Sequence, residues 1–292
     1  MERQLYLEIV DLLIRLGNRA RPTQTYDDVT IIKVYFWGVI HDRPVSWSCQ
    51  NRNWPVYDRR WAKPSESTMS QRLRTKSVKK LLLEIEYELV RKGHSHLVWL
   101  LDGKPLPIGG CSKDRQSGYG RAARSMARGY KIHVICGPDG SIPDWRVAPM
   151  NVDERVMGER MLRWAQVQGY VVADKNYDSN VLHATCQQRG VQLIAPRRYG
   201  AGAGHGHRKQ RAGRMRSKAI LENPFNAFGR DLLDQRRGIE QYFARLTNWG
   251  GGLTHLPPWV RTHRRVHRWV QAKLILCVIR QRLKHNELPS AA

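Results

Sequence analysis

Three carboxylates stand where they could hold a metal ion. Asp102 directly follows the apolar run 97–101 and Asp174 directly follows the run 170–173, so each aspartate ends a predicted buried strand. Carboxylates at neighbouring strand ends repel each other, and a divalent cation removes that repulsion. Glu240 lies beside the predicted buried face of a helix, where an acid is costly unless it binds something. Oxygen ligands of this kind select a hard cation, Mg²⁺ or Mn²⁺.

Each of these residues also has a purely structural interpretation. A single aspartate at a strand end is typical of a turn or a helix cap. Glu240 follows Arg236 by four residues, the spacing of an ordinary intrahelical ion pair. Only the combination of three acids in one chain favours a metal site over these local roles.

The charge balance indicates what such a site would act on. The 292 residues include 50 lysines and arginines but 25 aspartates and glutamates, a formal net charge of +25. This excess is typical of proteins whose basic side chains neutralise nucleic-acid phosphates. No membrane partner is expected, because the longest apolar run, residues 274–279, is far too short to span a bilayer. The pattern therefore predicts chemistry on DNA or RNA phosphates.

The cysteines and the N-terminal residues indicate a reduced compartment. The five cysteines are scattered and form no Cys-x-x-Cys pair, which argues against a disulfide scaffold or a zinc module. Glu8 and Asp11 interrupt any signal-like apolar region. We therefore expect a cytoplasmic protein without a small-molecule cofactor.

Helices dominate the predicted N-terminal region. Apolar periodicity predicts helices near residues 4–17, 27–41 and 77–92. A short helix within residues 64–74 would bury Met69 and Leu73 and expose polar side chains. It is either a DNA-recognition helix, with Arg72 and Arg74 as contacts, or an ordinary solvated helix.

Strand and helix patterns alternate after residue 93. The predicted strands are 96–101, 129–136, 141–149, 170–173 and 191–194, and the predicted helices are 153–168 and 179–189. The second and third strands form a hairpin around a Pro-Asp-Gly turn, and the later ones alternate with helices. This order predicts an α/β fold with a mixed sheet covered by helices.

Basic segments flank the helix that carries Glu240. Residues 197–218 contain no acid and many glycines, so a mobile loop is expected there. One helix is predicted over 227–247. A basic helix should follow it toward Asn286, packed through Val266, Trp269, Val270, Leu274 and Val278.

Four motifs together resemble a known family. Residues 102–106, 129–133, 173–179 and 236–243 resemble, in order and spacing, the DDE transposases of bacterial insertion sequences. The resemblance covers about residues 95–250. It implies an RNase H-like mixed sheet, with antiparallel hairpin strands plus parallel strands, flanked by helices. An N-terminal all-helical domain would precede this sheet in the sequence. The implied domains are 1–92 for DNA binding, 93–286 for catalysis and 287–292 as a disordered tail.

The resemblance also implies an activity. Asp102, Asp174 and Glu240 would be the catalytic triad that binds two Mg²⁺ or Mn²⁺ ions for strand cleavage and strand transfer on transposon and target DNA. The enzyme would be a nucleoid-associated bacterial protein that works as a homodimer on DNA. The expected DNA contacts are Arg72, Arg74, Lys131, Lys175, Arg208, Lys209, Arg211, Arg214, Arg236, Arg237 and Arg245.

Two positions depart from the pattern of many relatives. Leu233 stands where a tyrosine is usual before Arg236, and Thr247 stands where a lysine is usual after Glu240. Arg237 and Arg245 are the candidates to replace the lost phosphate contacts. Two alternatives to transposition therefore stay open: an inactive or repurposed DNA-binding protein, and a metal-dependent nuclease without strand transfer.

Overall fold

The chain forms two compact units. The computed structural model describes residues 1–16, 25–91, 95–109, 113–122, 125–198, 210–225, 227–249 and 252–287. One unit consists of Met1–Lys92, Asn248–Leu253 and Arg268–Ala292, and the other of Gly93–Thr247 and Thr254–His267. This division differs from the single catalytic domain expected over 93–286, because the residues beyond 267 group with the N-terminal unit.

Helices build the first unit. They are α1 (Glu2–Arg15), α2 (Asp28–Ile40), α3 (Val45–Ser48), α4 (Glu66–Arg72) and α5 (Lys76–Glu86), which a π-helical turn continues to Arg91. Two 3-10 turns, Asn51–Asn53 and Val56–Arg60, join α3 to α4. Each predicted helix is confirmed, including the short one at α4, where Met69 is fully buried and the Ser65 hydroxyl caps the N-terminus.

The long helix α11 (His263–Glu287) supplies the core of this unit. All residues from 269 to 277 are buried, so the helix is covered on every side over that stretch rather than along one stripe. Val278, predicted to be buried, is only half-buried. The buried stretch includes Lys273, whose ammonium donates to the carboxylate of Asp42 at 2.6 Å and to the carbonyl of Val39 at 2.9 Å.

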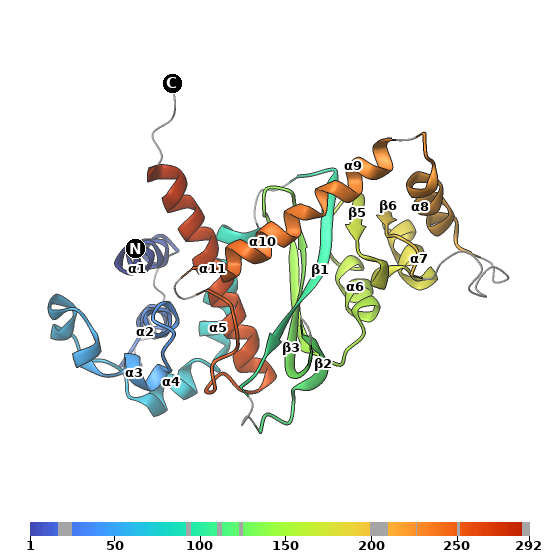
Figure 1. Cartoon of the computed structure of the whole chain (residues 1–292). Helices are drawn as coiled ribbons and strands as arrows, with labels where there is room; N and C mark the ends of the chain where they lie inside the picture. Colours follow the sequence, from blue (N-terminus) through green and yellow to red (C-terminus); the bar gives the residue numbers. More distant parts are fainter. Residues whose placement is uncertain are drawn as a thin grey trace. The chain divides into compact units, whose positions relative to one another are not determined.

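A six-stranded mixed sheet forms the centre of the second unit. Its strands are β1 (Val98–Pro107), β2 (Gly118–Ala122), β3 (Ser125–Cys136), β4 (Asp144–Pro149), β5 (Gly169–Ala173) and β6 (Val191–Ile194). β3 pairs antiparallel with β1, β2 and β4, while β1, β5 and β6 run parallel in the order β1-β5-β6. This arrangement confirms the predicted mixed sheet of antiparallel hairpin strands and parallel strands (Figure 1).

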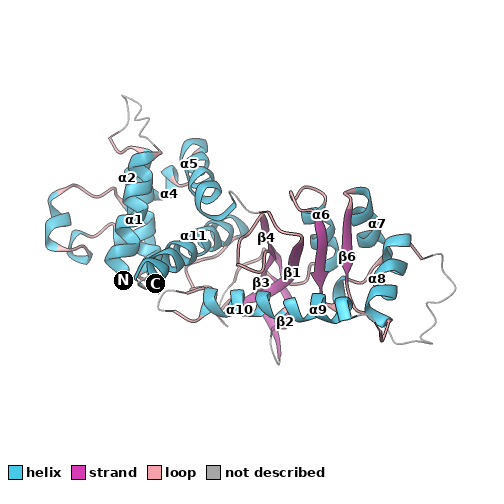
Figure 2. Cartoon of the chain, turned by 90° about the horizontal axis from the view of Figure 1, so that it is seen from above, coloured by secondary structure: helices cyan, strands magenta, loops and turns pink. Residues whose placement is uncertain are grey.

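Helices cover both faces of that sheet. The helices are α6 (Glu154–Leu162), α7 (Asn180–Gln188), α8 (Ala212–Glu222), α9 (Ala227–Gln235) and α10 (Arg237–Thr247). Figure 2 shows α6 and α7 on one face and α9 and α10 on the other. Leu101 and Val171 pack into the core under α6 and α7, whereas Leu100 lies against Gly238 of α10 and Tyr170 against Phe228 of α9.

Two predicted helices differ from the structure, and one strand was not predicted. The helix expected over 227–247 is two helices, because the chain turns at Arg236 between α9 and α10. The helix expected over 153–168 ends at Leu162. The strand β2 had not been predicted, since its glycines weaken the strand pattern.

The mobile loop predicted over 197–218 lies outside the described residues at 199–209, and from Ala212 onward the chain forms the helix α8 instead. Gly213 lets α8 approach α7, since a Cβ atom there would lie 3.3 Å from the carbonyl oxygen of His183. The hydroxyl of Ser217 accepts a hydrogen bond from the amide of Ala195 at 3.2 Å. Gly213 and Ser217 are therefore packing contacts of a helix. Within the described residues, no helix has both the length and the apolar composition that crossing a membrane requires.

Candidate active site

Asp102 and Asp174 emerge side by side from the middle of the sheet. The parallel pairing of β1 with β5 ends at Leu101 opposite Ala173, and the next residue of each strand is an aspartate. The sequence had suggested that Asp102 ends its strand. In the structure β1 instead continues past Asp102 to Pro107, paired with β3. The expected juxtaposition nevertheless holds, since both acids sit where the parallel pairing stops.

Burial controls the protonation of Asp102. Desolvation raises its pKa to about 6, the amide of Gly103 and the guanidinium of Arg236 oppose the shift, and the charges of Asp174 and Glu154 add to it. The Gly103 amide donates to Oδ1 at 2.7 Å. An acid with a pKa this high is poorly compensated by the protein and gains from a nearby cation.

Asp174 is oriented by the turn that it starts. It is the N-cap of the 3-10 turn Lys175–Tyr177. The amide of Asn176 donates to its Oδ1 at 2.9 Å, and the Asn176 side chain donates to its Oδ2 at 3.0 Å. Burial raises the pKa of Asp174, and the charge of Glu154 adds to that shift. Asp174 is thus a second partly desolvated carboxylate with a fixed orientation.

Arg236 reaches the pair from the turn between α9 and α10. Its Nη2 lies 4.0 Å from Oδ2 of Asp102. Its positive charge opposes the rise in the pKa of Asp102 and of Asp174 that burial causes. The Nε of Arg236 is buried without a hydrogen-bond partner among the described residues. The predicted phosphate-contacting arginine therefore stands beside the acidic pair.

Glu240 is not brought into contact with the two aspartates. It lies in the first turn of α10, on the helix that covers β1, but its side chain is exposed. Asp102 lies on the same face of β1 as Leu100, on which α10 packs through Gly238, so the helix covers the correct face of the strand. In the part of the chain that the structure describes, no three His, Cys, Asp or Glu side chains cluster closely enough to hold a metal ion.

Glu154 is a carboxylate near the pair that the sequence had not singled out. It lies in the first turn of α6, and its charge raises the pKa of Asp102, of Asp174 and of the buried Tyr177. Lys131 of β3, predicted to contact DNA, binds Glu154 at 2.5 Å. An acid directly after the helix-capping Asp153 was the available signal, but such an acid is usual in any first helical turn.

The other predicted DNA contacts fall into three groups. Lys175, Arg211, Arg237, Arg245 and Arg74 are exposed. Arg214 is bonded to Asp178, and Arg72 is bonded to Asp28 at 2.6 Å and to the carbonyl of Tyr26, so both stabilise the fold. Arg208 and Lys209 lie outside the described residues.

The two aspartates fit a hard divalent cation. Their donors are carboxylate oxygens only, and Mg²⁺ is usually held by one or two protein carboxylates with water and phosphate in its other positions. Burial raises the pKa of both side chains, so a cation would relieve a charge that the protein leaves partly uncompensated. Asp102 and Asp174 are therefore the residues that could hold Mg²⁺ or Mn²⁺.

Comparison with known proteins identifies the family of this chain. A family model described as "Transposase DDE domain" matches residues 93–278. Among solved structures, the chain is similar to a piggyBac transposase in a synaptic complex with hairpin DNA, with 9% sequence identity, a TM-score of 0.41 and coverage of 100% of this chain and 74% of that one. The comparison with curated proteins gives no match.

Proposed function

Because the chain belongs to the transposase DDE domain family, whose model matches residues 93–278, we propose that it cuts and joins DNA at the ends of a bacterial insertion sequence. It is a transposase by family, and the adjacency of Asp102 and Asp174 at the end of the β1–β5 pairing supports this chemistry most directly. The net charge of +25 fits a DNA substrate.

Asp102, Asp174 and Glu240 are the proposed metal-binding triad. The chemistry supplied by two bound Mg²⁺ or Mn²⁺ ions is activation of a water or 3′-hydroxyl oxygen and stabilisation of the oxygen that leaves the scissile phosphate. The amide of Gly103 and the two donors of Asn176 keep the aspartates oriented for this role. Because Glu240 does not cluster with the two aspartates in the described part of the chain, its participation requires that its side chain or the first turn of α10 move when DNA and metal bind.

Basic side chains around the acidic pair would position the DNA. Arg236 stands beside Asp102, and the exposed Lys175 directly follows Asp174. Arg237 and Arg245 are exposed on α10 and could bind phosphates of the same strand. We further propose that two copies act together, since transposition handles two DNA ends.

A DNA-binding protein without cleavage is the second candidate. The exposure of Glu240, together with Leu233 and Thr247 in place of polar partners, favours it. Such a protein would hold transposon ends equally well with or without EDTA and would nick them at no metal concentration.

The decisive experiment is a cleavage and strand-transfer assay on the inverted repeats that flank the reading frame. The wild-type protein should cut these ends in Mg²⁺ and join pre-cleaved ends to a plasmid. Asp102→Asn, Asp174→Asn and Glu240→Gln should each abolish cutting but keep DNA binding, whereas Glu159→Gln, at a surface ion pair with Arg163, should change neither. Full cleavage by any of the three variants would refute the assignment of that residue, and cleavage without joining would identify a simple nuclease.

A further inference from the structure

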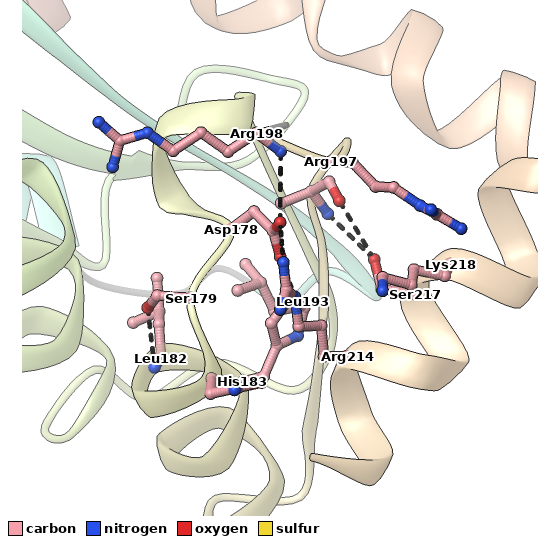
Figure 3. A network of polar contacts seen from close by, with 12 residues as sticks. Asp178, Ser179, Leu182, His183, Leu193, Arg197, Arg198, Arg214, Ser217 and Lys218 are labelled. Carbon is pink, nitrogen blue, oxygen red and sulfur yellow. Dashed lines mark hydrogen bonds and ion pairs between the residues drawn. The ribbon is translucent and has the colours of Figure 1, made fainter. Parts of the chain in front are cut away.

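A buried carboxylate, Asp178, lies four residues after Asp174. Arg214 of α8 donates to it through Nε at 2.7 Å and through Nη2 at 2.6 Å, a two-point ion pair that Figure 3 shows. The amide of Arg198 donates to Oδ2 at 3.3 Å, and His183 of α7 lies 3.4 Å from Oδ1. One carboxylate thus connects three separate segments of the chain.

These contacts keep Asp178 ionised. Burial would raise its pKa, but the nearby imidazole of His183 and the hydrogen bonds and charge of Arg214 outweigh burial and hold the pKa well below the usual range. A group that stays ionised under all working conditions cannot serve as a general acid or base. Asp178 is therefore a fixed anion whose role lies in what it holds in place.

What Asp178 holds is the turn of Asp174. The amide of Asp178 donates to the carbonyl of Lys175 at 3.3 Å, and the amide of Tyr177 donates to the carbonyl of Asp174 at 3.1 Å. Tyr177 is fully buried against α6, where Gly158 leaves room for its ring. The turn is thus fixed in its middle by Tyr177 and at its end by Asp178.

We propose that Asp178 is a positioning residue for Asp174: its two-point ion pair with Arg214 fixes the turn that presents the second metal-binding carboxylate. This inference rests on the proposed function, because it assumes that Asp174 binds metal. Residues that orient metal ligands usually affect metal affinity although they never touch the ion. Arg214, predicted to contact DNA, acts through Asp178 instead.

The same unit contains a matched control. Asp114 is also a buried carboxylate, and it accepts hydrogen bonds from the hydroxyl of Tyr130 at 2.7 Å and from the amide of Thr262 at 2.8 Å. It is not connected to the turn of Asp174. Asp114→Asn and Asp178→Asn both remove a buried, hydrogen-bonded charge, so both should lower the melting temperature.

The test compares Mn²⁺ binding by calorimetry in the full-length variants, at a temperature where each is folded. Asp178→Asn should weaken Mn²⁺ binding by about tenfold or more and lower the rate of strand cleavage, with the Kd for transposon-end DNA unchanged. Asp114→Asn should leave Mn²⁺ affinity at the wild-type value.

Arg214→Lys provides a milder variant, because lysine keeps the charge but loses the two-point geometry. It should give an intermediate Mn²⁺ affinity, and it replaces Asp178→Asn if that variant does not fold. Equal Mn²⁺ affinities for the wild type, the Asp178 or Arg214 variant and Asp114→Asn would overturn the proposal. If the wild type bound no Mn²⁺, the proposed metal-binding function would be refuted. If the wild type and the variants bound Mn²⁺ equally well, only the positioning role of Asp178 would be refuted.

Discussion

The guanidinium of Arg236 lies 4.0 Å from the carboxylate of Asp102, at the turn between α9 and α10. It occupies the place of a counter-cation beside two carboxylates that burial leaves partly uncompensated. A divalent ion at Asp102 and Asp174 would have to share or displace this positive charge. Arg236 and the metal are therefore expected to compete electrostatically.

Replacing Arg236 should strengthen metal binding while weakening catalysis. At pH 8, above the raised pKa of Asp102, Arg236→Gln should lower the Kd for Mn²⁺ by roughly fivefold, a typical coupling between two sites. Cleavage of transposon ends should fall because the phosphate contact is lost. Arg237→Gln is the control, since that side chain is exposed and pairs with Asp234. An Mn²⁺ affinity for Arg236→Gln that is unchanged or weaker would contradict the competition.

The raised pKa of Asp102 predicts how stability depends on pH. The pKa of about 6 in the folded protein exceeds the ordinary value of 3.8. The protonated carboxyl of Asp102 therefore contributes fully to the free energy of unfolding below pH 3.8, and this contribution is lost as the pH rises through 6. Above that pH the ionised group destabilises the metal-free fold by about 3 kcal/mol. Asp102→Asn should therefore be more stable than the wild type in EDTA at pH 8.

Urea unfolding in EDTA at two pH values checks this prediction. The advantage of Asp102→Asn should disappear toward pH 4, where the wild-type carboxyl is largely protonated, and adding Mn²⁺ at pH 8 should stabilise only the wild type. A variant less stable than the wild type at pH 8 would show that burial of this acid is fully compensated within the protein.

Lys273 predicts a stabilising substitution in the first unit. Burial lowers the pKa of its fully buried ammonium, and Asp42 only partly opposes that shift. Replacing Lys273 by an apolar residue leaves only the half-exposed carboxylate of Asp42, which water can solvate, whereas replacing Asp42 leaves the ammonium buried without that carboxylate. Lys273→Met should therefore raise the free energy of unfolding by about 1 kcal/mol, and Asp42→Asn should lower it by about 3 kcal/mol.

The test compares the thermal stabilities of these two variants with that of the wild type. Asp42 has a φ of 50°, a conformation that asparagine also tolerates, so Asp42→Asn introduces no backbone strain of its own. Thermal unfolding followed by circular dichroism should rank Lys273→Met above the wild type and Asp42→Asn below it. The reverse order would mean that the ammonium itself stabilises this core.

The strands of the sheet were predictable because their pattern is local. Apolar runs and the hairpin turn located β1, β3, β4, β5 and β6 from the sequence alone. The end of β1 was not predictable, since residues 103–107 include a glycine and two prolines, which disfavour strands. These residues stay extended because β3 pairs with them along their whole length. The pairing of β1 with β5 has already ended at Leu101, so a proline, which has no amide hydrogen to donate, is tolerated at the edge that β5 no longer covers.

The site was predictable only where strand order determines it. Asp102 and Asp174 follow from two apolar runs and one parallel pairing. Glu154 lies near the two aspartates because of how α6 packs, and Arg214 reaches Asp178 because of how α8 packs. No local sequence pattern predicts the packing of either helix. The exposure of Glu240 depends on the turn at Arg236, which interrupts what the periodicity had suggested was a single helix.

The interleaved division of the chain has a consequence for its biosynthesis. A ribosome releases the N-terminal helices before the sheet, and it releases the buried stretch 269–277 of α11 only after the entire sheet. The sheet unit can therefore finish folding while the apolar helix α2 still lacks the buried neighbour that completes its own core. Nascent chains stalled or terminated before residue 268 should need a chaperone for their first unit even though their acidic pair is already in place.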